Sequence, residues 1–197
     1  MSGSSSGFAN EALASVRRSP VPGNGVLLKG NFHMRVLDAH GFIKYDNPNI
    51  PNGITNQGLA QIYGEVFGAT AHITPWYLGL IDGPFTAGDV GDGKDADTMA
   101  SHANWVEFTE FTGTPNRQTI SLDTVATRSL NNSSVVSYTV AGLGAAQEVG
   151  GIFVTDLQSA TTGGVLFSTA AISTPPTVNN TDVIEVTYTI TALASSD

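Results

Sequence analysis

The sequence predicts a mainly β protein: an antiparallel sandwich or jelly-roll-like body with one short helix and an extended N-terminal arm. The segment DVIEVTYTITA at residues 182–192 alternates apolar and polar side chains, as a strand with one buried face does. Only 13% of the 197 residues are charged, and short apolar runs are separated throughout by turn residues. In the body a single segment has helical spacing, so antiparallel strands dominate the prediction.

The first 30 residues have the composition of an arm, so we expect an extended arm at 1–30 and a β-rich body at 31–197. MSGSSSG is typical of a linker, Phe8–Arg18 favours a short helix, and SPVPGNG ends regular structure. Its apolar side chains favour an arm that is held by a partner. The predicted interface residues are Phe8, Leu13, Val16, Arg17, Arg18, Leu27 and Leu28.

The body begins with a predicted hairpin. Asn31–Asp38 alternates in the manner of a half-buried strand, and Phe42–Tyr45 returns after a turn at residues 39–41. Residues 47–53 read as a loop, because Pro48 and Pro51 lack the N–H that a β-ladder uses.

Residues 55–67 form the best helix candidate, and Gly68 is a natural stop. Gly58 and Gly64 within it favour close packing against a sheet. The apolar residues at three- and four-residue spacing are Leu59, Ile62, Val66 and Phe67.

The rest of the chain reads as strands joined by linkers that contain glycine, proline, asparagine or serine. We expect the sheet to anchor on the tryptophan-bearing runs on either side of a loop rich in glycine and aspartate. The predicted strands are Trp76–Ile81, Trp105–Phe111, Gln118–Ala126, Val135–Val140, Glu148–Thr155, Gly164–Thr169 and Asp182–Ala192.

The net charge of −9 is unevenly distributed. Residues 1–50 carry five basic and three acidic residues, whereas the remainder carries three basic and fourteen acidic ones. This asymmetry favours an arm that docks on an acidic surface, although scattered charges explain it equally well. The acidic body argues against nucleic-acid binding, and the chain lacks the apolar run of roughly 18 residues that a membrane span needs. The absence of cysteine excludes disulfides and thiolate metal sites.

The densest acidic cluster is the loop GDVGDGKDADT, whose carboxylates are the ligand type that calcium prefers. Their spacing does not match the EF-hand pattern, which favours a solvated acidic loop. We therefore predict no metal site, with weak calcium candidates at Asp89, Asp92, Asp95 and Asp97.

No catalytic constellation stands out. Ser101 and His102 lie near acidic residues, but they are adjacent in sequence and no nucleophile elbow surrounds them. His33, His40 and His72 are isolated, whereas a metal site needs several converging ligands. We predict that the protein is not an enzyme and has no cofactor.

Aromatic residues gather on the tryptophan-bearing strands. They form either a sugar-stacking platform or part of the core, and offsets of this kind in paired strands favour the core. The residues are Trp76, Tyr77, Trp105, Phe108 and Phe111.

Several segments resemble a group of small virion proteins of tailed bacteriophages. They are GNFHMRVLDAHGFIKYDNPNIPNGITNQGL, TPWYLGLID and DTMASHANWVEF, followed by EVGGIFVTD, GGVLFSTAAI and DVIEVTYTI. The resemblance covers about residues 30–192, leaves the arm outside, and includes an aspartate-rich loop longer than expected. It implies no individual functional residue.

The resemblance implies a structural virion protein, namely a capsid decoration or cement protein that binds and stabilises the phage head. Its expected partners are the major capsid protein and further copies of itself, without nucleic acid or membrane. Its expected location is the capsid surface, after synthesis in the host cytoplasm. The alternative is a tail, neck or fibre component, or a glycan-binding host-recognition module.

Overall fold

The computed structural model describes residues 26–83, 98–99, 106–113, 117–123, 129–159 and 163–194 of the chain. These residues form one helix and a set of strands whose pairings are all antiparallel. The predicted mainly β, antiparallel fold is confirmed. The elements are β1 (Val26–Leu37), β2 (Ile43–Ile54), α1 (Asn56–Phe67), β3 (Trp76–Gly83), β4 (Glu107–Phe108), β5 (Gln118–Ile120), β6 (Ser129–Asn131), β7 (Val136–Thr139), β8 (Gln147–Thr155), β9 (Leu166–Ala171), β10 (Thr177–Val178) and β11 (Val183–Ala194).

The first and last strands form the longest ladder. β1 and β11 pair without interruption from Val26 opposite Ala194 to Leu37 opposite Val183. The alternation predicted for both strands is confirmed, because Phe32, Met34 and Val36 of β1 have no exposed surface. Ile184, Val186 and Tyr188 of β11 are likewise buried. The first and last strands of the body are thus held together by their ladder and by the side chains that both bury on the same face of the sheet.

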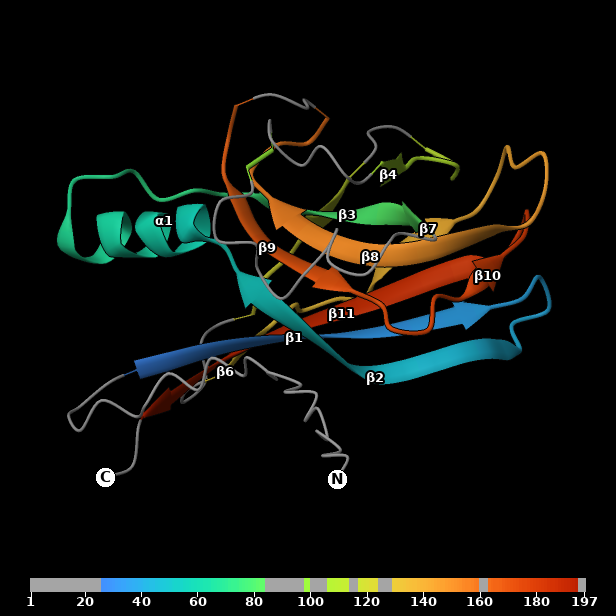
Figure 1. Ribbon diagram of the computed structural model, residues 1–197, viewed down its shortest axis with the longest axis horizontal. Coiled ribbons are helices and arrows are strands. Elements are labelled where there is room, and N and C mark those ends of the chain that lie inside the picture. The colour runs from blue at the N-terminus through green and yellow to red at the C-terminus, as the bar shows by residue number, and fades with distance from the viewer. Residues whose placement is uncertain are drawn as a thin grey trace, which may run out of the picture.

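The strands form two layers joined at one edge, in a sandwich-like arrangement (Figure 1). One layer is built around β2, β1 and β11, and the other around β3, β8 and β9. The order is β4-β3-β8-β9-β2-β1-β11-β6, and the layers are continuous because Gly53 and Ile54 at the end of β2 pair with β9. The inner faces meet in a single apolar cluster that contains Phe32 and Val186 from one layer and Leu78 and Ile152 from the other. The jelly-roll connectivity stays a prediction.

β2 corrects the prediction of a loop at residues 47–53. The strand runs to Ile54, with Pro51 opposite Asn31 of β1, and the register shifts between Phe32 and Met34, where Pro48 lies. Along residues 43–52, which include both prolines, β2 pairs with β1 alone among the described strands, so only one side of the strand has a neighbour that needs its N–H groups. The Asn31 amide also donates to the Pro48 carbonyl at 2.8 Å. An edge position with a bulge therefore accommodates both prolines.

Several strand boundaries differ from those predicted. β1 begins at Val26, five residues before the predicted start of the first strand at Asn31. The strand predicted at residues 105–111 is reduced to β4 and an isolated bridge between Phe111 and Val140. The strand predicted at residues 118–126 contains β5 and a bridge from Leu122 to Asn132. β6 and β10 are short additional strands that the sequence pattern did not reveal.

Helix α1 confirms the predicted helix and its close packing against the sheet. Thr55 caps the N-terminus by accepting from the Gly58 N–H at 3.0 Å, and Gly68 ends the helix. Gly58 lies so close to β9 that an added Cβ would come within 2.4 Å of the Phe167 carbonyl oxygen. Of the apolar residues at helical spacing, Val66 and Phe67 are 65% and 82% exposed. Only one short arc of the helix contacts the sheet.

The outer face of the β3–β8–β9 layer has a second apolar cluster, formed by Ile81, Met99, Phe153 and Leu166. Arg117 is buried beside it, with its guanidinium 5.3 Å from the centre of the Phe153 ring. The guanidinium also donates to both carboxylate oxygens of Glu107, at 2.9 and 2.8 Å. This layer is therefore packed on both faces, which explains why Gly151–Thr155 of β8 is continuously buried.

Among the described residues, no helix is long and apolar enough to cross a membrane.

Candidate functional site

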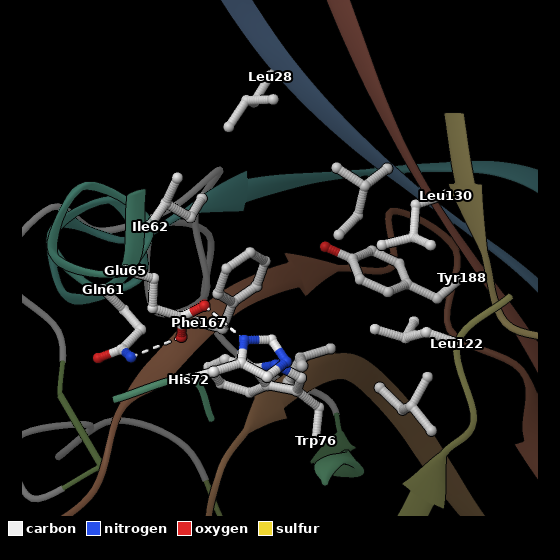
Figure 2. Close-up of a pocket in the computed structure, with 13 residues that line it drawn as sticks. Leu28, Gln61, Ile62, Glu65, His72, Trp76, Leu122, Leu130, Phe167 and Tyr188 are labelled. Carbon is white, nitrogen blue, oxygen red and sulfur yellow. Dashed lines mark hydrogen bonds and ion pairs between the residues drawn. The ribbon is translucent and has the colours of Figure 1, made fainter. Parts of the chain in front are cut away.

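An apolar pocket lies at the end of the sandwich that α1 covers, the same end at which β1 begins and β11 finishes (Figures 1 and 2). Its volume is about 280 Å³. The residues that line it come from α1, both sheet layers and the segments between them. They are Leu28, Gln61, Ile62, Glu65, His72, Trp76, Ile120, Leu122, Leu130, Val154, Phe167, Tyr188 and Ile190.

Local contacts of α1 set the position of the pocket. The N–H of Thr55 donates to the Phe167 carbonyl at 3.0 Å, and its hydroxyl donates to the Leu166 carbonyl. Gln57 accepts from the Leu166 N–H at 3.0 Å. The start of the helix is thus fixed to β9, and Gly58 permits the close approach. The following turn places Ile62 and Glu65 over the open ends of the sheets.

Aromatic side chains form much of the pocket wall. The rings of Trp76 and Phe167 are tilted against each other with centroids 5.1 Å apart. The Tyr188 hydroxyl accepts from the Asn52 amide at 3.0 Å and lies 3.4 Å from the Ser168 hydroxyl. Burial raises the pKa of Tyr188 to about 12, so this hydroxyl is neutral at physiological pH. The wall is therefore apolar and uncharged.

One side of the pocket mouth is polar. The carboxylate of Glu65 accepts from the Gln61 amide at 2.7 Å and from the Ile73 N–H at 3.1 Å, and it lies 2.7 Å from Nδ1 of His72 (Figure 2). Burial on its own raises the pKa of Glu65, but these hydrogen bonds together lower that pKa below its ordinary value. A negative charge is therefore held at the rim, where the His72 side chain is 73% exposed.

This arrangement is suited to binding an apolar group. The walls offer apolar surface, and the Glu65 carboxylate offers an acceptor to a donor or a cation at the rim. Within the ranges that the structure describes, no three histidine or acidic side chains converge to hold a metal ion.

The predicted site residues are only partly covered by the structure. The calcium candidates Asp89, Asp92, Asp95 and Asp97 lie outside the described residues, as do Ser101 and His102. Of the predicted interface residues, Phe8, Leu13, Val16, Arg17 and Arg18 also lie outside. Leu27 is placed through its backbone in β1, and Leu28 lines the pocket.

The histidines that the sequence leaves isolated acquire partners in the fold. Nε2 of His33 lies 2.7 Å from the Asp46 carboxylate, and His72 pairs with Glu65. The backbone N–H of His40 donates to Asp38 at 2.8 Å. His33 joins adjacent strands, so its pairing is structural, whereas His72 belongs to the pocket rim.

The expectation that the aromatic cluster belongs to the core is confirmed for Phe108 and Phe111, which are buried. Phe111 packs edge-on against Tyr138, with ring centroids 4.8 Å apart. Trp76 is partly buried against the same core and also lines the pocket, and Trp105 lies outside the described residues.

Sequence reasoning missed the pocket as a whole. Its lining residues are spread from Leu28 to Ile190, so no local spacing connects them. The one local signal is Gln61 and Glu65, four residues apart on the helix, because this spacing brings them together on one face.

No family model, no curated protein and no solved structure matches this chain. No role can therefore be transferred from a relative, and a proposed function has to stand on the residues themselves.

Proposed function

We propose that this chain is a structural protein of a tailed-bacteriophage virion, namely a capsid decoration or cement protein that binds and stabilises the head. The observation that carries the proposal is the order of the segments in residues 30–192 that resemble small phage virion proteins. Two of these segments, NFHMRVLD and DVIEVTYTI, coincide with the central pair β1 and β11. These two segments thus belong to the longest ladder of the sheet.

Exposed apolar side chains support a role in protein contacts. Tyr63, Val66 and Phe67 on the outer face of α1 are 60%, 65% and 82% exposed, and the rings of Tyr63 and Phe67 are 6.4 Å apart. Phe42 and Ile43, at the turn between β1 and β2, are also exposed. Large apolar side chains that cluster on a surface are typical of protein contact sites.

Charge also supports such a role. The chain carries eight basic and seventeen acidic residues, so it would not bind packaged DNA non-specifically. The proposed partners are therefore the major capsid protein and further copies of the chain, without nucleic acid or membrane. The proposal places the protein on the capsid surface after synthesis in the host cytoplasm, and it assigns no catalytic role and no cofactor.

Weak contacts suffice for this role when many copies act together. Each copy on a shell contributes its own contacts, and neighbouring copies multiply them through avidity. The first 25 residues and the body are the proposed contact elements, because a segment that lies along a partner gains much contact area from few residues.

The test is the copy number per purified virion, measured by quantitative mass spectrometry against the major capsid protein. Many copies in a simple ratio to the shell would support a decoration protein. A handful of copies would instead favour the tail, neck or fibre alternative. Absence from the particle would contradict any virion role.

A glycan-binding role needs a separate measurement. Trp76 lines the pocket, so sugar binding there should quench its fluorescence. Quenching by a panel of host-surface sugars would favour this alternative, and unchanged emission would count against it.

A further inference from the structure

The pocket lies beside the point at which the first 25 residues join the described body. β1 begins at Val26, and Leu28, on the same strand, already contributes to the pocket lining. Figure 2 shows Leu28 on the same side of the pocket as Ile62 of α1. The described body therefore begins next to this pocket.

The pocket favours an occupant that is apolar and flanked by positive charge. Trp76, Phe167 and Ile190 offer apolar walls, and the Glu65 carboxylate lies at the rim. The occupant must be small, because the pocket volume is about 280 Å³, which is space for a few apolar side chains.

The segment at residues 8–18 has this chemistry. Its helical pattern brings Leu13 and Val16 to one face, and Arg17 and Arg18 follow directly. Residues 1–25 carry two basic residues and one acidic residue, whereas residues 26–197 carry six basic and sixteen acidic ones. The segment is therefore net positive and the body net negative, so the two attract each other.

Chain connectivity favours docking within the same copy. Seven residues, 19–25, separate the segment from β1, and seven residues span at most about 25 Å when fully extended. Such a short tether gives an effective local concentration on the order of millimolar, so even weak apolar contacts are populated. Docking on a second copy lacks this advantage in dilute solution.

We propose that the pocket beneath α1 holds Leu13 and Val16 of the chain's own N-terminal segment, with Arg17 and Arg18 near Glu65. The contact covers apolar surface that the described body leaves open. It does not depend on the virion role, because docking is a property of the isolated chain. If the protein proved absent from the virion, docking of the segment would still be expected. If the segment proved not to dock, the expected copy number on the particle would not change.

Trp76 provides the first test, because it lines the pocket and a Trp105→Phe background leaves it as the sole tryptophan. Leu13→Asp with Val16→Asp should release the segment. We expect the emission of Trp76 to move to longer wavelength and acrylamide quenching to increase. Ala14→Asp with Ser15→Asp is the matched control, since it adds the same charge on the other face of the segment. Equal spectra for both pairs would overturn the proposal.

Cross-linking provides the second test and does not depend on the tryptophan background. The chain has no cysteine, so Val16→Cys with Leu122→Cys introduces a single possible disulfide between the segment and the pocket lining. Oxidation at low protein concentration should give a monomeric, faster-migrating species on a non-reducing gel. Val16→Cys with Phe42→Cys is the control, because Phe42 lies at the far end of β1 and is 71% exposed.

A disulfide-linked dimer would assign the pocket to the segment of a second copy and would overturn docking within one copy. Absence of any cross-link, with both thiols reactive towards maleimide, would overturn it as well.

Discussion

At the scale of single residues, Arg117 is a fully buried charged side chain that pairs with Glu107. Its side chain has no exposed surface, and its partner Glu107 is 13% exposed. The guanidinium also donates to the Leu157 carbonyl at 2.8 Å, so it links β4 to the segment after β8. A buried ion pair of this kind is costly to break, because the remaining charge keeps its desolvation penalty without its partner.

Replacing Arg117 with methionine should therefore lower the free energy of unfolding by about 3–5 kcal/mol, measured by urea denaturation followed by circular dichroism. Arg35→Met is the control, because Arg35 pairs with Glu185 at 2.5 Å but is 38% exposed. That pair should contribute no more than about 1 kcal/mol. Adding Glu107→Gln to Arg117→Met should recover part of the loss, and equal losses in the single and double variants would contradict the role of the stranded charge.

Glu65 makes the pocket rim sensitive to pH. Hydrogen bonds outweigh burial and lower its pKa below the ordinary value of 4.5. The charged form therefore stabilises the fold above that value, and the stabilisation is lost as pH falls through the folded pKa. The melting temperature of the native protein should exceed that of Glu65→Gln at neutral pH, and the gap should narrow as the pH falls below the ordinary pKa of 4.5. A gap that is constant over this range would contradict the assignment.

At the scale of elements, α1 packs closely on β9 through Gly58, a residue that helix propensity disfavours. Glycine costs a helix up to about 1 kcal/mol relative to alanine, so Gly58→Ala should stabilise an isolated helix. In this fold a Cβ at Gly58 would lie 2.4 Å from a backbone oxygen of β9, and that atom cannot rotate away.

We expect Gly58→Ala to lower the thermal midpoint and to weaken the contact between α1 and β9. Hydrogen exchange of the α1 amides, compared with those of β11, should show the loss locally. Ala60→Gly is the control, because Ala60 is exposed and the change should cost only the propensity difference of about 1 kcal/mol. A stabilised Gly58→Ala variant would mean that the helix can move away from the sheet without loss.

The same elements show what the sequence reveals. β1, β3, β8 and β11 were predictable, because apolar runs or alternation mark strands that bury one face or both. β2 was not, because Pro48 and Pro51 suggest a loop unless the strand is known to lie at an edge.

The outer face of α1 could not be predicted either, since spacing identifies an apolar stripe but not what covers it. The pocket could not be predicted from the sequence for a related reason. Its lining exists only after strands distant in sequence have paired.

At the scale of the whole molecule, the β1–β11 ladder makes the fold depend on both ends of the described chain. Val26 and Ala194 are paired, and the two strands together supply Phe32, Met34, Val36, Ile184, Val186 and Tyr188 to the core. Contacts between residues so far apart in sequence require the closure of a long loop. An all-β fold of this kind folds slowly, on the order of milliseconds to seconds.

Truncation at the two ends should therefore have unequal effects. Removing residues 1–25 leaves the ladder complete, so the variant should keep a cooperative thermal transition and a β-type circular dichroism spectrum. Ending the chain at Asp182 removes β11 and leaves β1 without its longest pairing, so that variant should show no cooperative transition. Adding a peptide of residues 183–194 should restore the transition, because a missing strand can be supplied in trans. Cooperative unfolding of the chain that lacks β11 would show that the remaining strands form an independent core and that the terminal ladder is not what holds the layers together.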